Sequence, residues 1–283
     1  MIPANASVYR PKVNAVTRLF GRRQAVIGVI HALPLPGSAQ YDGAPMVTIY
    51  DHARAEAARY RAGGVDGLIV ENHGDIPFAK PDELGPETAA AMAVMTEKVR
   101  GDTGLPIGVN VLANGAVQAL AVAKAAGASF IRVNQWANAY VANEGFMEGK
   151  AGAASRYRAW LKAADIAVFA DVHVKHGAHA IMADRTLTEL TRDAEFFDAD
   201  AVIVTGQRTG DGARLDDLST VRQSTGLPVL VGSGVTPDNV AAIFRFADAV
   251  IVASALKHDG GWWNEVDPAR LARFMDVVRK VRG

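Results

Sequence analysis

One stretch of the sequence, residues 166–175, alternates apolar side chains with side chains that can carry a charge. Asp171, His173 and Lys175 share one parity of this alternation, and the valines between them share the other. Successive side chains of a β-strand point to opposite faces, so the three polar groups are expected on one face. A carboxylate, an imidazole and an amine placed together can accept and donate protons. We therefore take Asp171, His173 and Lys175 as candidate catalytic residues.

The same parity test finds polar side chains near the ends of other apolar runs. Glu71 or Asn72 ends the run 67–72, and its carboxylate makes Glu71 the fourth catalytic candidate. The substrate-binding candidates found in this way are His31, Asn110, Arg132, Asn134 and Thr205. Several charges buried in one place are sustainable only as a paired network around solvent or a ligand. A purely structural network is the alternative, but it has little reason to collect at one end of the strands.

Eight short runs rich in Val, Ile and Leu carry these side chains. They are residues 25–31, 67–72, 106–112, 129–134, 166–174, 201–206, 228–234 and 248–254. Such runs mark strands that are buried on both faces of a parallel sheet, and helix-like stretches lie between them. We predict an α/β fold, a single (β/α)8 TIM barrel over residues 25–283, with its active site at the carboxyl ends of the strands. A doubly wound open sheet would show the same alternation, but the count of eight favours the barrel.

A phosphate site is predicted after the seventh and eighth runs. Gly232, Ser233 and Gly234 follow one run and lead to a helix expected from Thr236, and Ser254 ends the other run. In many barrels these two loops and a helix N-terminus hold a phosphate group. The alternative is that the glycines only permit a tight turn. Arg208, in a glycine-rich loop after the sixth run, is a further candidate for holding an anionic substrate group.

His173, His176 and His179 recur every three residues, which raises the possibility of a divalent metal. No cysteine or acidic cluster strengthens that interpretation, so we predict neither a metal nor another cofactor. Lys175 also has two interpretations, a Schiff-base amine or a charge partner of Glu71 or Asp171, and we favour the second.

Composition excludes several classes of protein. The 283 residues include 30 Lys and Arg against 30 Asp and Glu, and this balance argues against a nucleic-acid partner. The sequence contains no cysteine, which excludes disulfides and Cys-ligated zinc and fits a cytoplasmic protein. No apolar run approaches the roughly 18 residues of a transmembrane segment. Residues 1–24 are basic and lack acidic residues, and we interpret them as an arm before the barrel rather than a targeting peptide.

Two aromatic loops complete the picture. Residues 135–150 are long and rich in Asn and Gly, which favours a lid over the substrate, with a subunit contact as the alternative. Trp262 and Trp263 are candidates for a subunit interface, so we expect a homo-oligomer.

Several motifs resemble those of the BtpA/SgcQ family. They include Ile27-Gly-Val-Ile-His-Ala-Leu-Pro-Leu-Pro-Gly37, Gly67-Leu-Ile-Val-Glu-Asn72, Ala170-Asp-Val-His-Val-Lys-His176 and Val231-Gly-Ser-Gly-Val235. The resemblance runs from about residue 25 to residue 267 and implies a barrel of the ribulose-phosphate-binding type. It also implies two functional directions, because the family's namesake is associated with photosystem I biogenesis at a membrane, whereas other members look like parts of carbohydrate-utilisation gene sets. No site residue is taken from the resemblance.

Two hypotheses follow. In the first, the protein is an enzyme that acts on a sugar phosphate or a phosphorylated glycoside as an isomerase, lyase or hydrolase, with carboxylate and histidine groups for proton transfer. In the second, it is an assembly factor that docks on a membrane or complex through its basic arm and tryptophan pair. The inward polar side chains favour the enzyme.

Overall fold

Eight parallel strands form a closed barrel in the computed structural model, which describes residues 11–206 and 212–283. The strands are β1 (Ala25–His31), β2 (Gly67–Glu71), β3 (Ile107–Asn110), β4 (Phe130–Val133), β7 (Ala167–Asp171), β8 (Ala201–Val204), β9 (Val229–Val231) and β10 (Ala249–Val252). Each strand pairs in parallel with the next one in this order, and β10 pairs with β1 to close the ring. The predicted barrel is therefore confirmed, and the open sheet is excluded.

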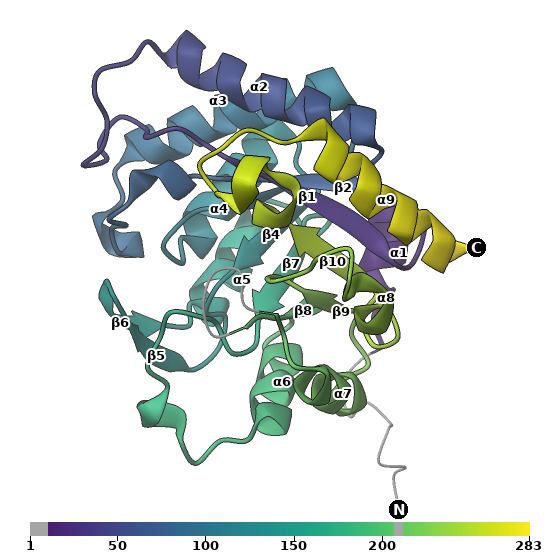
Figure 1. Ribbon diagram of the computed structural model, residues 1–283. Helices are drawn as coiled ribbons and strands as arrows, with labels where there is room; N and C mark the ends of the chain where they lie inside the picture. The colour runs from purple at the N-terminus through teal and green to yellow at the C-terminus, as the bar shows by residue number, and fades with distance from the viewer. Residues whose placement is uncertain (1–10, 207–211) are drawn as a thin grey trace, which may run out of the picture.

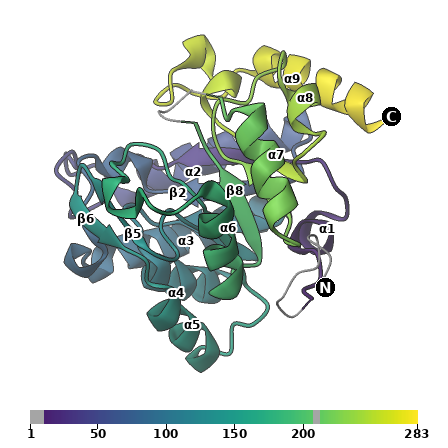
Figure 2. The same cartoon turned by 90° about the horizontal axis from the view of Figure 1, so that it is seen from below.

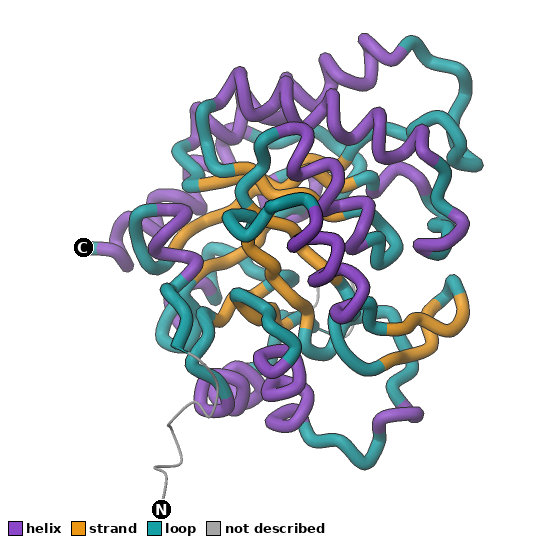
Figure 3. The backbone as a smooth tube through the Cα atoms, turned by 180° about the vertical axis from the view of Figure 1, so that it is seen from behind, coloured by secondary structure: helices purple, strands orange, loops and turns teal. Residues whose placement is uncertain are grey.

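Helices surround the ring of strands (Figures 1 and 3). They are α2 (Met46–Gly63), α3 (Pro86–Thr103), α4 (Ala116–Ala126), α5 (Ala151–Trp160), α6 (Leu187–Phe196), α7 (Leu215–Ser224), α8 (Val240–Ile243) and α9 (Pro268–Arg282). Helices α6 and α7 pack side by side, as the view from below shows (Figure 2). The left-handed glycines Gly64, Gly104 and Gly127 end α2, α3 and α4 a few residues before the next strand, because glycine adopts this conformation without steric cost.

The barrel interior changes character along its axis. One apolar cluster fills the half nearer the amino ends of the strands, and it includes Ile27, Ile69, Phe130, Phe169, Ile203, Leu230 and Ile251. A second, larger cluster lies between the outward faces of the strands and the helices. Toward the carboxyl ends, the inward side chains on β1 to β4 and β7 become polar. The core therefore leaves one end of the barrel to polar chemistry.

A short helix, α1 (Ala15–Phe20), closes the amino end of the barrel. The ring of Phe20 packs edge-on against Phe130, with 5.8 Å between the ring centroids. Gly67 makes room for it, since a Cβ atom there would lie 2.5 Å from the Phe20 ring. This part of the basic arm is thus an apolar plug in the barrel floor.

Three aspartates that each precede a strand hold the strand ends on the same side as α1. They are Asp66, Asp200 and Asp248, and they accept hydrogen bonds of 2.7–3.0 Å from the backbone N–H groups of Val26, Val168 and Val229. Basic residues complete the pairing: Lys12 with Asp200, Arg23 with Asp248, and Arg282 with Asp66. Much of the positive charge in residues 11–24 is therefore matched by the barrel itself.

The segment 135–150 contains a two-stranded hairpin, β5 (Ala139–Ala142) and β6 (Gly145–Glu148), that extends from the side of the barrel (Figure 1). The buried Trp136 anchors it, because its indole N–H donates to the carbonyl of Phe197 at 2.8 Å. Val141 and Phe146 are exposed on the hairpin.

The plug yields a stability prediction. Phe20→Ala should lower the free energy of unfolding by about 3–5 kcal/mol, because a buried aromatic ring is removed and a cavity remains. Urea unfolding followed by circular dichroism measures this change. Val13→Ala, at an exposed position just before α1, is the matched control and should change it by less than about 0.5 kcal/mol. Equal effects of the two substitutions would contradict a role for α1 in the barrel floor.

Candidate functional site

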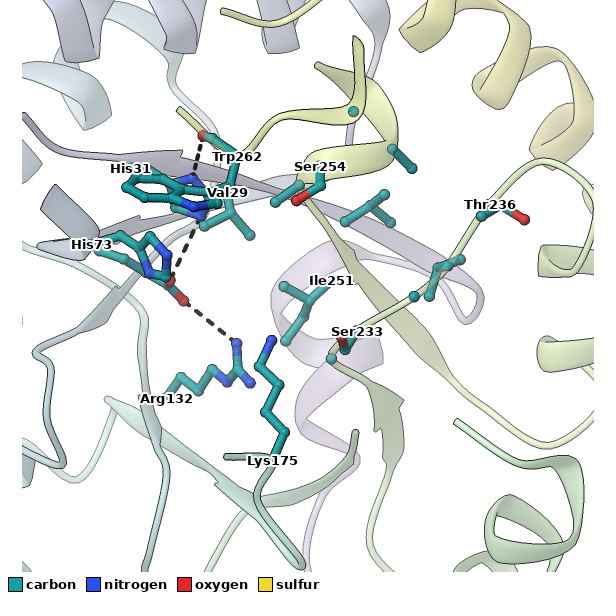
Figure 4. Close-up of a pocket in the computed structure, with 18 residues that line it drawn as sticks. Val29, His31, His73, Arg132, Lys175, Ser233, Thr236, Ile251, Ser254 and Trp262 are labelled. Atoms are coloured by element: carbon teal, nitrogen blue, oxygen red, sulfur yellow. Dashed lines mark hydrogen bonds and ion pairs between the residues drawn. The ribbon is translucent and has the colours of Figure 1, made fainter. Parts of the chain in front are cut away.

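A cavity of about 240 Å³ opens among the carboxyl ends of the barrel strands. Side chains from β1, β2 and β4 line one side of it, and the loops after β9 and β10 line the other (Figure 4). A second cavity of about 420 Å³ adjoins it, because Glu71, His73, Arg132, Lys175 and Trp262 line both.

Arg132, which points inward from β4, connects two buried carboxylates. Its Nε and Nη2 atoms donate to the two oxygens of Asp171 on β7, at 3.3 and 3.1 Å. Its Nη1 atom lies 3.5 Å from Oε1 of Glu71 on β2. The sequence predicted these three side chains at the same end of the barrel on separate strands. The structure places them in one hydrogen-bonded network.

Two asparagines complete the hydrogen bonding of the carboxylates. Asn110 on β3 donates to Oε1 of Glu71 at 3.0 Å, and Asn134 donates to Oδ2 of Asp171 at 3.1 Å. These donors leave the second oxygen of Glu71, Oε2, for another partner. We call His31, Glu71, Asn110, Arg132, Asn134 and Asp171 the polar wall of the cavity.

The network favours the charged forms of Glu71 and Arg132. Burial alone would raise the pKa of Glu71, but Arg132, the neighbouring histidines and Asn110 together lower it below its ordinary value. Burial likewise opposes the charge of Arg132, yet Asp171 and Glu71 raise its pKa. Glu71 is therefore a carboxylate at neutral pH.

His31, at the end of β1, lies beside Glu71 with 3.9 Å between its Nε2 and Oε2 of the carboxylate. Its Nδ1 lies 2.9 Å from the carbonyl oxygen of Trp262. Because a carbonyl only accepts hydrogen bonds, Nδ1 carries the proton. Burial lowers the pKa of His31 to about 3, so the ring is neutral and its Nε2 presents a lone pair.

His73 stacks on His31, with ring centroids 4.5 Å apart, and meets the Trp262 ring edge-on at 4.4 Å. It lies in a single turn, η1 (His73–Asp75), that follows β2. Parity along a strand does not reach such a residue, so our sequence analysis missed it. The turn depends on Gly74, where a Cβ atom would lie 2.6 Å from the carbonyl oxygen of Ala32, and this contact between distant segments leaves no pattern in the sequence.

Asn72 and Asp75 fix this turn from behind. Asn72 exchanges hydrogen bonds with the backbone of Leu112 and donates to Asp75 at 2.9 Å. Asp75 in turn accepts from the N–H of Leu35 at 2.8 Å. Of the two residues considered at the end of β2, Glu71 faces the cavity and Asn72 supports the loops.

Trp262 reaches the site from the loop after β10, which a buried ion pair anchors. The Lys257 ammonium lies 2.9 Å from Glu56 on α2 and also donates to the carbonyl of Asn264. Lys257 is therefore a buried cation that holds this loop against α2. Trp262 is half-buried against the histidines, whereas Trp263 is exposed.

The loop after β9 passes close to the polar wall. A Cβ atom at Gly232 would lie 2.6 Å from Ile203 and 3.2 Å from the Arg132 guanidinium, so the glycine makes room for both. Asn239 shapes the loop by donating to the carbonyl of Gly234 and accepting from the N–H of Thr236, both at 2.8 Å. The helix expected from Thr236 accordingly begins only at Val240, as α8. The backbone N–H groups of Ser233 and Gly234 donate to none of the described residues.

Ser233, Gly234 and Ser254 line the cavity together with Gly232 (Figure 4). Lys175 lines it as well. Thr205 lies at the end of β8 and donates to the carbonyl of His173 at 3.2 Å. Arg208 lies outside the described residues.

The structure does not bring His173 to the cavity. Strand β7 ends at Asp171, so the alternation no longer holds two residues later. The ring of His173 instead stacks on His179, at 3.7 Å between centroids, and His179 stacks on Tyr140. His176 is exposed, and the three histidines do not converge on one point. In the described part of the chain, the group with metal-binding geometry is a different one, His31, Glu71 and His73, whose ligand atoms all lie within 4.8 Å of one another.

Comparison with known proteins finds one family. The model of the BtpA family matches residues 22–280. An uncharacterized protein of Archaeoglobus fulgidus is 42% identical over 92% of this chain and 99% of its own. An uncharacterized mitochondrial protein of Caenorhabditis elegans is 40% identical over 92% and 95%. The photosystem I biogenesis protein BtpA of Synechocystis is 39% identical over 92% and 89%.

Solved structures share the fold at low sequence identity. The (S)-3-O-geranylgeranylglyceryl phosphate synthase of Thermoplasma acidophilum superposes with a TM-score of 0.58 at 16% identity, over 94% of this chain and 97% of its own. The thiamine phosphate pyrophosphorylase of Pyrococcus furiosus gives 0.56 at 14% identity, over 92% and 97%. These neighbours are TIM barrels of the ribulose-phosphate-binding type.

The Arg132 network predicts a large stability effect. Arg132→Met should lower the free energy of unfolding by about 3–5 kcal/mol, because it leaves the carboxylates of Asp171 and Glu71 buried without their cation. Arg54→Met removes an exposed ion pair with Asp102 and should change it by less than about 1 kcal/mol. Chemical denaturation of both variants measures the difference, and a small effect at Arg132 would contradict the buried network.

Proposed function

The chain belongs to the BtpA family, and we propose that it is an enzyme that acts on a small phosphorylated metabolite, a sugar phosphate or a phosphorylated glycoside. The observation that supports this most is the composition of the cavity. One side presents a buried carboxylate and neutral histidines, and the other presents glycine and serine backbone.

The loops after β9 and β10 suit a phosphate group. Gly232 and Gly234 line the cavity, and the N–H groups of Ser233 and Gly234 have no partner among the described residues. The hydroxyl-bearing Ser233 and Ser254 lie beside them. Backbone N–H groups and hydroxyls of this kind are common phosphate ligands in TIM barrels. The synthase of Thermoplasma acidophilum, which shares the fold, was solved in complex with a phosphorylated substrate, sn-glycerol-1-phosphate.

Proton transfer falls to the polar wall. Glu71 is ionised, and its Oε2 atom receives no hydrogen bond from Arg132 or Asn110, which both bind Oε1. Lys175 lines the same cavity and offers an acid or a charge partner for an anionic substrate. Asp171 acts through Arg132, whose guanidinium it holds in place, and touches no substrate itself.

The adjoining cavity provides space for the rest of the substrate. Asn110 and Asn134 supply amide groups for hydroxyls there, and Phe78 and Tyr140 supply aromatic surface. A substrate with its phosphate between the loops after β9 and β10 would lie beside Glu71 and extend into this second cavity. An isomerase, an aldol-type lyase and a glycosidic-bond hydrolase all use such an arrangement of acid–base groups.

The alternative role as an assembly factor receives less support. Lys12 and Arg23 of the basic arm are paired with Asp200 and Asp248 of the barrel, which offsets part of the charge that a partner would meet. In the described part of the chain, no helix has the length and apolar character needed to cross a membrane.

Ligand binding tests the proposal. Thermal-shift measurements with inorganic phosphate and a panel of sugar and nucleoside phosphates should show stabilisation of the protein, because a ligand that binds only the folded state raises the melting temperature. Ser254→Glu should weaken phosphate binding at least about tenfold through like-charge repulsion. Ala153→Glu adds the same charge at an exposed position on α5 and should leave binding unchanged. A flat response to every phosphorylated compound, or equal binding by the two variants, would contradict the proposal.

A further inference from the structure

The geometry points to a divalent transition-metal site formed by His31, Glu71 and His73, on the polar wall and facing the phosphate loops. Two of the ligands end neighbouring strands, β1 and β2, and the third stands on the turn directly after β2. Two imidazoles and one carboxylate on one face of a cavity are a donor set that zinc, iron, cobalt and related ions accept with coordination positions left open.

His31 and Glu71 face each other in a way that favours a cation between them. Nε2 of His31 carries a lone pair, because the Trp262 carbonyl holds the proton on Nδ1. It lies 3.9 Å from Oε2 of the Glu71 carboxylate, which is too long for a hydrogen bond. Two electron-rich atoms held toward each other in a buried place repel unless a cation lies between them. A bound metal ion would supply that charge.

His73 provides a buried ring nitrogen as the third ligand. Its Nδ1 atom is buried and has no hydrogen-bond partner in the part of the chain that the structure describes. A buried polar atom without a partner is uncommon in native proteins and calls for an explanation, of which an ion is one. The three ligand atoms lie within 4.8 Å of one another. Ligand atoms around one ion are roughly 3–4 Å apart, given bonds of about 2.0–2.2 Å, so rotamer adjustments suffice to close the site.

The residues around His31 and Glu71 also suit a metal site. Histidines that bind metals almost always donate their other ring N–H to a carbonyl or carboxylate, and carboxylate ligands are themselves hydrogen-bonded. His31 donates to the carbonyl of Trp262, and Oε1 of Glu71 accepts from Asn110 and Arg132. Oε2 is thereby left for the ion. The hydrogen bonds that would orient His31 and Glu71 as metal ligands are therefore already present in the protein.

The location gives the ion a role that rests on the proposed function. The same cavity is lined by His31, Glu71 and His73 on one side and by Ser233 and Ser254 on the other. With the phosphate of the substrate between the loops after β9 and β10, an ion held by His31, Glu71 and His73 would contact another oxygen of the substrate. It would polarise a carbonyl or hydroxyl there, or lower the pKa of a bound water molecule, in place of direct proton transfer by Glu71. This differs from our sequence analysis, which considered a metal only at His173, His176 and His179.

Metal titration of the chelator-treated protein tests the site directly. Calorimetry with Zn²⁺ should show one ion bound per chain, and Co²⁺ should give visible absorption bands of a nitrogen- and oxygen-coordinated ion. His31→Gln and His73→Gln should each weaken binding by more than about 100-fold, because even groups that only support a ligand are worth roughly 10- to 100-fold. His258→Gln, at an exposed histidine in the loop after β10, is the matched control and should bind as the wild type does. Thermal unfolding of each variant confirms that it is folded.

The outcomes separate this inference from the proposed function. Wild-type protein that binds no ion, or a His73→Gln variant that binds as tightly as the wild type, overturns the metal site. Inorganic phosphate is titrated into the same metal-free samples. Phosphate binding without metal binding overturns only the metal site, and metal binding without any response to phosphorylated compounds overturns only the proposed function.

Discussion

The mouth of the barrel depends on Arg132, whose guanidinium serves two buried carboxylates from different strands. Burial alone would favour the neutral form of Glu71, and Arg132 is the main group that lowers the pKa of this carboxyl. Arg132 itself would be unfavourable there without both carboxylates. The planar guanidinium forms two parallel bonds to Asp171 and so fixes its own orientation toward Glu71. Asn110 and Asn134 bind the same two carboxylates and so complete this arrangement.

The two sides of the cavity use different parts of the backbone. Strands β1 to β4 and β7 are neighbours in the ring, and they contribute side chains to the polar wall from one continuous arc. Strands β9 and β10 contribute small residues and backbone N–H groups from the opposite arc. The amino ends of β2, β8 and β10 carry the aspartates that pair with the arm and with α9. These ion pairs lie at the opposite end of the barrel from the candidate site, which is the arrangement usual in this fold.

The sequence predicted those parts of the fold and the site that follow from strand alternation. Asn110, Arg132 and Asp171 lie at inward positions on their strands, as parity predicted. His31 ends β1, as predicted, and Glu71 rather than Asn72 ends β2. His173 shows where the rule stops, because its position lies beyond the last residue of β7. His73 and Trp262 come from turns whose course depends on contacts between distant segments, such as Gly74 against Ala32 and Lys257 against Glu56. No local pattern encodes such contacts, which is why the neighbours of His31 could not be foreseen.

The closure of the ring between β1 and β10 has a consequence for biosynthesis. Ile27 pairs with Ile251, and Asp66 pairs with Arg282, so β1 and Asp66 find these partners only in β10 and α9, which are synthesised much later. Until then the strand edge of β1 and the apolar lining of the barrel remain open to solvent. Unpaired edges and exposed apolar surface are the features by which nascent chains aggregate and recruit chaperones. The nascent chain is therefore most prone to aggregation while the strands that carry the polar wall exist but β10 has not yet closed the barrel.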